Sequence, residues 1–181
     1  DGGDYTISFN GSGITENGMS ASGNAAISII NNNCTVIIGN TKEVEDGTTK
    51  LEMSWSGYDG FESFDSLTVS VRFDDVTYQE YYSGALEYSE IIDGAVSASI
   101  SGNESRVQIA LSGTSSELNN QTITMETTTP IKQRLSDMYP YQGVIEVKGG
   151  GGTSVVYTVV ANGVEISLNG GQPVLVIWEE I

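Results

Sequence analysis

The side chains of this sequence that could do chemistry are mostly carboxylates. The chain of 181 residues has 24 Asp and Glu residues, no histidine and one cysteine. Without an imidazole it cannot form a Ser-His-Asp triad, a Cys-His pair or a histidine-ligated catalytic zinc site. It also lacks the G-x-x-x-x-G-K-[ST] loop of P-loop phosphate chemistry. The catalytic chemistry still open is that of a glycoside hydrolase, which needs two carboxylates about 5–10 Å apart in a cleft.

Calcium is the cation that these carboxylates suit best, because calcium takes six to eight oxygen ligands. Asp59, Glu62 and Asp65 lie within seven residues of each other, between the apolar runs that end at Trp55 and begin at Leu67. The segment does not match an EF-hand loop, so solvated loop carboxylates are the alternative interpretation. We predict a candidate Ca²⁺ site at these three carboxylates.

Tyrosines form the second candidate site. Tyr78, Tyr81, Tyr82 and Tyr88 fall within eleven residues. On a strand, Tyr78 and Tyr82 would share one face and Tyr81 would lie on the other. Tyrosine is a large, rigid and amphipathic contact residue, which suits a glycan or an envelope protein as ligand. Aromatic residues also favour strands for structural reasons alone.

The charge balance excludes several partners. Seven Lys and Arg residues leave a net charge of −17, and these cations are scattered along the chain. Such a surface repels phosphate backbones and anionic headgroups, so we expect no nucleic-acid binding. No apolar run approaches the roughly 18 residues of a membrane helix, so we expect no transmembrane segment. The oligomeric state is left open.

Alternating apolar and polar residues dominate the chain and predict half-buried strands. In one run, Leu67, Val69, Val71 and Phe73 alternate with polar residues, and similar runs recur from the N-terminus to the C-terminus. Turn residues separate these runs at short intervals. The pattern predicts an all-β fold of antiparallel hairpins and meanders, arranged as a β-sandwich or a barrel-like sheet.

Three turns are predicted specifically. Asn31–Asn33 is expected to form a hairpin, because asparagine tolerates left-handed backbone conformations. Asn162-Gly163 carries the strongest hairpin signal between two alternating runs, and the glycines at 149–152 should connect two further strands.

One short helix is expected near residues 130–138, with Pro130 at its first position. We interpret residues 1–181 as a single domain, which the helix could divide into 1–128 and 139–181.

The segment from Tyr139 to Thr158 resembles a recurring element of uncharacterised bacterial secreted or lipoprotein-type β-domains. In that element a Tyr-Pro-x-x-Gly turn leads into a strand, a glycine-rich hairpin and a second strand, as in YPYQGVIEV, GGGG and TSVVYT here. The resemblance implies export, although the lipobox cysteine used for lipidation does not occur in this sequence. We therefore expect an extracytoplasmic location, with an export signal upstream.

These observations favour a non-catalytic binding or structural domain of the cell envelope, with an unknown ligand. A carboxylate-dyad glycoside hydrolase and a calcium-stabilised adhesin-like domain are the alternatives.

Overall fold

The computed structural model describes residues 3–14, 20–57 and 64–180. All strands of this part belong to one antiparallel sheet whose spatial order equals the chain order, β1 to β11. The strands are β1 (Gly3–Ile14), β2 (Ser20–Ile38), β3 (Thr41–Ser56), β4 (Ser66–Tyr82), β5 (Ala85–Ser101), β6 (Glu104–Ser115), β7 (Thr122–Arg134), β8 (Gln142–Lys148), β9 (Ser154–Val160), β10 (Gly163–Leu168) and β11 (Val174–Ile177).

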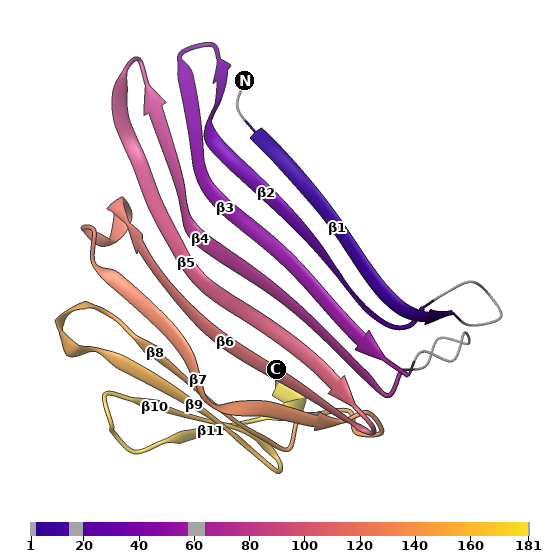
Figure 1. Ribbon diagram of the computed structural model, residues 1–181. Helices are drawn as coiled ribbons and strands as arrows, with labels where there is room; N and C mark the ends of the chain where they lie inside the picture. The colour runs from indigo at the N-terminus through magenta and orange to yellow at the C-terminus, as the bar shows by residue number, and fades with distance from the viewer. Residues whose placement is uncertain (1–2, 15–19, 58–63, 181) are drawn as a thin grey trace.

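The all-β, antiparallel meander is therefore confirmed, whereas the sandwich or barrel-like arrangement is wrong. The described strands make a single open sheet with β1 and β11 at its two edges. The sheet is strongly curved, and its long N-terminal strands lie at a steep angle to the short C-terminal ones (Figure 1). Alternation predicts that each strand has one apolar face, but it does not say what covers that face.

The predicted helix at 130–138 is also wrong, because β7 continues to Arg134. The register between β6 and β7 is interrupted between the Val107–Ile131 and Ala110–Glu126 pairs, and Pro130 lies in this interruption. Proline has no N–H to donate, so a bulge accommodates it as well as a first helical turn does. The described residues contain only three short 3-10 turns, η1 (Ser116–Leu118), η2 (Gly150–Gly152) and η3 (Trp178–Glu180).

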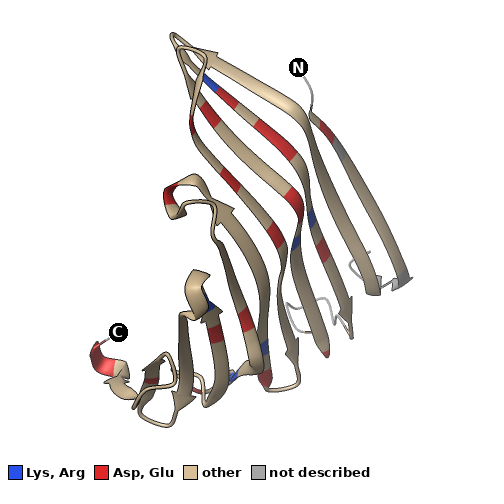
Figure 2. Cartoon of the chain, turned by 90° about the vertical axis from the view of Figure 1, so that its left-hand side faces the viewer, with Lys and Arg blue, Asp and Glu red and all other residues tan. Residues whose placement is uncertain are grey.

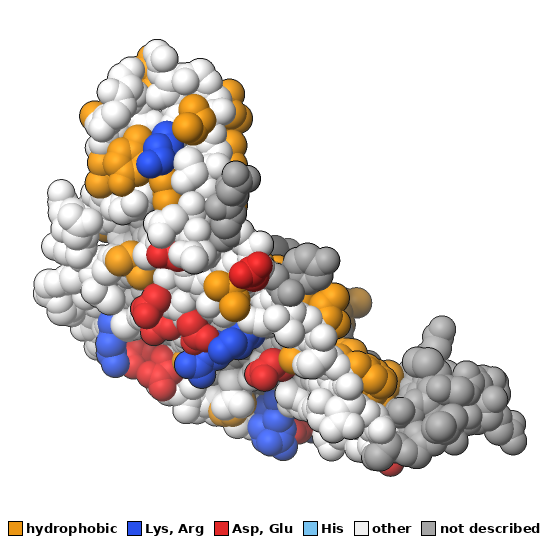
Figure 3. All heavy atoms as spheres, turned by 45° about the horizontal axis from the view of Figure 1, so that its top comes forward, with side chains coloured by type: hydrophobic (Ala, Val, Ile, Leu, Met, Phe, Trp, Pro, Cys, Tyr) orange, Lys and Arg blue, Asp and Glu red, His pale blue; other side chains and the backbone are white. Residues whose placement is uncertain are grey.

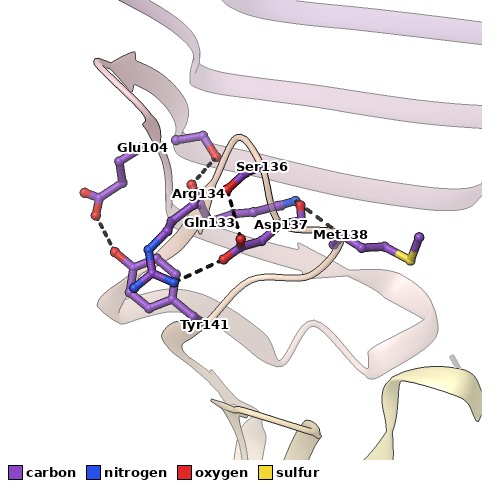
Figure 4. A network of polar contacts seen from close by, with 8 residues as sticks. Glu104, Gln133, Arg134, Ser136, Asp137, Met138 and Tyr141 are labelled. Atoms are coloured by element: carbon purple, nitrogen blue, oxygen red, sulfur yellow. Dashed lines mark hydrogen bonds and ion pairs between the residues drawn. The ribbon is translucent and has the colours of Figure 1, made fainter.

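Side-chain contacts hold the turn between β7 and β8 where the helix was expected (Figure 4). Gln133 Nε2 donates to the carbonyl of Asp137 at 2.7 Å, and Arg134 Nη1 pairs with Asp137 Oδ2 at 3.2 Å. The Arg134 guanidinium also lies 4.7 Å from the centre of the Tyr141 ring, and the Tyr141 hydroxyl donates to Glu104. The network ties this turn to the start of β6.

The two glycine-containing hairpin predictions are confirmed. β9 and β10 are joined through Ala161 and Asn162, and the glycines at 149–152 connect β8 to β9. The Asn31–Asn33 hairpin is wrong, because β2 passes through this segment and turns only after Ile38. The asparagines instead form a bulge in β2, where Asn33 has φ +50°.

Candidate functional site

A broad band of apolar residues crosses one face of the sheet from β1 to β11. Residues that are direct cross-strand partners point to the same side of a sheet, so the register defines each face. We call this the apolar face. Three register rows define it: Ile7, Ile27, Leu51, Val71, Val96 and Ile109 across β1 to β6; Phe73, Gly94, Leu111, Met125, Val147, Val155 and Leu168 across β4 to β10; and Ile145, Tyr157, Ile166 and Val174 across β8 to β11.

These rows contain no charged side chain, although 31 of the 181 residues are Asp, Glu, Lys or Arg, the sum of 24 and 7. Much of the apolar face is accessible to solvent. Met53 in β3, a strand paired on both sides, is 38% exposed, and Val44 is the only buried hydrophobic residue among those described. The apolar face thus has the composition of a protein core without a second layer in the described part of the chain.

The apolar face is hollowed where β5, β6 and β7 meet η1. Its apolar lining includes Ile92, Leu111, Ile123, Met125 and Leu118 of η1, and Glu90 of the neighbouring acidic region also borders it. Hollows with a mostly apolar lining are where anchor side chains dock in many protein interfaces.

Bulges and residues with positive φ angles form a line across β2 to β5, next to the apolar rows. Gly47 in β3, Asp75 in β4 and Gly94 in β5 have positive φ angles, and Asn33 in β2 continues the line. A Cβ on Gly94 would lie 2.0 Å from the carbonyl oxygen of Ala110, and one on Gly47 would lie 2.5 Å from that of Asp75. Bulges and glycines of this kind bend a sheet. We call this line the crease.

Beyond the crease, the same face changes from apolar to acidic and aromatic. Two register rows cross β3, β4 and β5 there, and we call their six residues the Glu–Tyr cluster: Glu43, Glu80 and Tyr88 in one row, and Glu45, Tyr78 and Glu90 in the other. Each tyrosine has glutamates around it, so phenol hydrogens can be donated to carboxylates.

Two contacts order this cluster. The ring centres of Tyr78 and Tyr88 are 5.9 Å apart, and the Tyr88 hydroxyl donates to Glu90 Oε2 at 2.6 Å. Desolvation, followed by the nearby charges of Glu43 and Glu80, raises the pKa of Tyr78. The hydrogen bond to Glu90 is the main cause that raises the pKa of Tyr88. Both phenols therefore stay neutral to a higher pH than usual and act as hydrogen-bond donors.

The four predicted tyrosines do not form one surface. Tyr78 and Tyr88 belong to the Glu–Tyr cluster, whereas Tyr81 pairs with Lys42 on the opposite face, where the Lys42 ammonium lies 5.3 Å from the ring centre. Tyr82 ends β4 and is 53% exposed. The predicted separation of Tyr81 from Tyr78 is thus correct, but Glu43 and Glu45 were missed because they come from another strand, β3, and only the register brings them beside β4. Their alternation in β3, Glu43 and Glu45, is visible in the sequence.

Of the predicted calcium ligands, Asp59 and Glu62 lie outside the described residues. Asp65 is exposed, and its backbone closes a turn by donating to the carbonyl of Ser56 at 2.9 Å and accepting from the N–H of Gly102 at 3.2 Å. In the described ranges, no group of three or more His, Cys, Asp and Glu side chains is arranged to hold a metal ion. Calcium binding at Asp59, Glu62 and Asp65 stays a prediction.

The opposite face, which we call the polar face, carries all seven basic residues. The register places Lys42, Lys50, Arg72, Arg106, Lys132, Arg134 and Lys148 on this side. Basic positions lie among acidic ones along the strands (Figure 2), and side chains of both signs gather together on this part of the surface (Figure 3).

Ion pairs link these charges both along a strand and across neighbouring strands. Asp74 accepts from Arg72 and, at 3.1 Å, from Lys50 Nζ, while Glu104 lies between Arg106 at 2.7 Å and Lys132 at 3.8 Å. The basic residues are therefore occupied within the sheet rather than gathered for a phosphate ligand.

Comparison with protein-family models, with curated protein sequences and with solved structures found no match. In the segments described above, no helix has the length and apolarity that crossing a bilayer requires. The function proposed below therefore rests on the geometry of this chain.

Proposed function

We propose that this chain is a non-catalytic binding module that docks the apolar surface of a partner protein on its apolar face. The observation that carries the proposal is the charge-free field that extends over β1 to β11 and stays partly open to solvent. Contiguous exposed apolar patches larger than a few hundred Å² are rare on soluble monomers and usually mark interaction sites.

The total accessible surface supports this proposal. It is 11463 Å² for a chain of 19.2 kDa, whereas a compact monomer of this mass exposes about 8,400 Å². Interface areas count both partners, so covering this excess of about 3,000 Å² would bury roughly 6,000 Å² in total, the size of the largest permanent interfaces. A partner that covers the apolar face would give the sheet the second layer that domains ordinarily have.

The chemistry of the site favours a protein over a glycan. Sugar-binding sites need polar groups that converge on hydroxyls, whereas the apolar face offers aliphatic side chains and a hollow lined by Leu111 and Met125. An extracytoplasmic location and an envelope protein as the partner belong to this proposal, and both rest on the sequence pattern of residues 139–158.

The Glu–Tyr cluster is the part of the structure most relevant to a glycoside hydrolase. Its closest carboxylates in register, Glu43 and Glu80, are direct partners on adjacent strands of an open sheet. The catalytic pair of a hydrolase instead flanks a bound sugar. Binding at the apolar face is therefore the function that the geometry supports better.

The proposal is tested with a matched pair of variants on β3. Met53 lies on the apolar face and is 38% exposed, and the neighbouring Ser54 is exposed on the polar face. We expect the native protein to bind an apolar fluorescent dye. Met53→Glu should weaken this binding at least about tenfold, because it places a charge on the apolar face. Ser54→Glu should leave the binding unchanged, because it changes the polar face.

Circular dichroism of both variants checks that the sheet still forms. A native protein that does not bind the dye, or equal effects of the two substitutions, would contradict the proposal.

A further inference from the structure

We infer that the β1 edge of the sheet is a self-association site, at which β1 of a second copy of this chain adds as an antiparallel strand. This inference concerns the edge of the sheet and is independent of docking on the apolar face. It begins from the backbone. In the part of the chain that the structure describes, β1 pairs with β2 on one side only, so the other side of a 12-residue strand presents unpaired N–H and C=O groups.

Natural proteins protect such edges with lysine, proline, bulges or short strands, because an open edge is a template for another strand. β1 contains no lysine and no proline, and its register with β2 is continuous from Gly3 to Ser12. Its side chains add to the exposure, since Ile7 and Phe9 on the apolar face are 66% and 68% exposed.

The other edge of the same sheet shows the protection that β1 lacks. β11 has only four residues, and Pro173 directly precedes it. The acidic turn η3, with Glu179 and Glu180, follows it. Among the described strands, β11 is therefore protected against strand addition, whereas β1 shows none of these protections.

Charge and symmetry identify a second copy as the occupant. The net charge of −17 should keep two copies apart, but β1 carries a single charged residue, Asp4. Antiparallel pairing of β1 with itself about a two-fold axis keeps apolar side chains on one face and polar ones on the other. Such an isologous contact is the commonest arrangement in homodimers.

The side chains also select a register. With the two-fold axis at Ser8, Ile7 of one copy lies opposite Phe9 of the second copy. Pairs of an aromatic and a β-branched residue are among the stabilising cross-strand pairs. Phe9 already packs near Trp55, with ring centres 5.7 Å apart, so the added strand would extend the apolar face across the dimer.

The first experiment measures the dimer dissociation constant by sedimentation velocity over a wide concentration range. Ile7→Lys should raise this constant at least about tenfold, because lysine on an edge opposes strand addition. Val174→Lys is the matched control, since Val174 is equally exposed, at 66%, on the opposite edge strand. It should leave the constant unchanged.

The second experiment tests the register by cross-linking in a Cys34→Ser background. Direct antiparallel partners have Cα atoms about 4.5–5.5 Å apart, which suits a disulfide. Ser8→Cys should therefore give a disulfide-linked dimer under mild oxidation, and Ser54→Cys, on the polar face of β3, should not.

Three results would overturn the inference: a native chain that is monomeric at all concentrations, a dimer that Val174→Lys weakens as much as Ile7→Lys does, or a dimer that is lost in Met53→Glu but kept in Ile7→Lys. The last result would mean that copies associate through the apolar face. Dye binding by the Ile7→Lys monomer tests the apolar face separately, so the two proposals can fail independently.

Discussion

At the scale of single residues, two of the many carboxylates have a lowered pKa, and each of these accepts from positively charged or hydroxyl donors. Asp74 and Glu104 each accept from two partners across the polar face, and hydrogen bonds from Arg72 and from Tyr141 are the largest causes that lower their pKa values. Most other carboxylates lie along strand surfaces with no such pair of donors described. Local acid–base behaviour thus follows from spacing along a strand and from register together, since Arg72 lies in β4 with Asp74, whereas Lys50 and Tyr141 reach the two carboxylates from outside their strands.

These lowered pKa values predict how stability depends on pH. In the unfolded chain, Asp and Glu titrate near about 3.9 and 4.3. Because the folded-state pKa values are lower, the two carboxylates stabilise the fold fully above those values, and the stabilisation is lost as the pH falls through the folded-state values. We expect the double variant Asp74→Asn and Glu104→Gln to lose less Tm between pH 7 and pH 3 than the native protein does.

Thermal melts followed by circular dichroism at fixed ionic strength measure this difference. The control is Glu165→Gln combined with Glu179→Gln, which removes two carboxylates outside the ion pairs described above. Equal losses of Tm in the native protein and in the Asp74 and Glu104 variant would contradict the prediction.

At the scale of elements, the crease determines where the strands bend and where the apolar rows end. Gly94 has φ +122°, and a Cβ there would collide with the Ala110 carbonyl. Gly102, in the turn between β5 and β6, also has a positive φ, +56°, but a Cβ there meets nothing within 4 Å. A substitution at Gly102 therefore introduces backbone strain alone, whereas one at Gly94 introduces backbone strain and a steric collision.

We expect Gly94→Ala to lower the free energy of unfolding by about 3 kcal/mol or more, because strain and collision add. Gly102→Ala should cost only about 1 kcal/mol, which is the strain of a left-handed residue alone. Urea denaturation at one protein concentration measures both. If Gly102→Ala cost as much as Gly94→Ala, the close approach of β5 to β6 at the crease would be wrong.

The strands could be predicted from the sequence because alternation is a local property. Leu67, Val69 and Val71 alternate with polar residues, and they lie on one face of β4 as expected. The bulges could not be predicted, since Asn33 and Pro130 suit a turn or a helix start as well as an irregular strand. The Glu–Tyr cluster was also out of reach, because it depends on the registers of β3, β4 and β5 rather than on spacing along one of them.

At the scale of the whole molecule, this chain of 181 residues buries less surface in its single sheet than a compact protein of the same mass does. Alternation showed that each strand has an apolar side but carried no information on a second layer, and this is why a sandwich or barrel was expected. The single layer and its excess surface are the observations from which we propose that contacts with other molecules cover the apolar face.

The heat capacity of unfolding measures this property directly. A compact protein of 181 residues has a ΔCp of about 2.2–2.7 kcal/mol/K. The unfolded chain exposes about 27,800 Å², so a surface of 11463 Å² means that unfolding exposes about one sixth less area than it would for a compact fold. Apolar exposure raises ΔCp, and the surface left open is largely apolar. We therefore expect calorimetry of the Ile7→Lys monomer to give a ΔCp below the range of a compact protein.

A ΔCp within the range of a compact protein would mean that the apolar face is already covered in the isolated chain. A deficit that disappears when a partner protein binds would show that the partner supplies the missing layer.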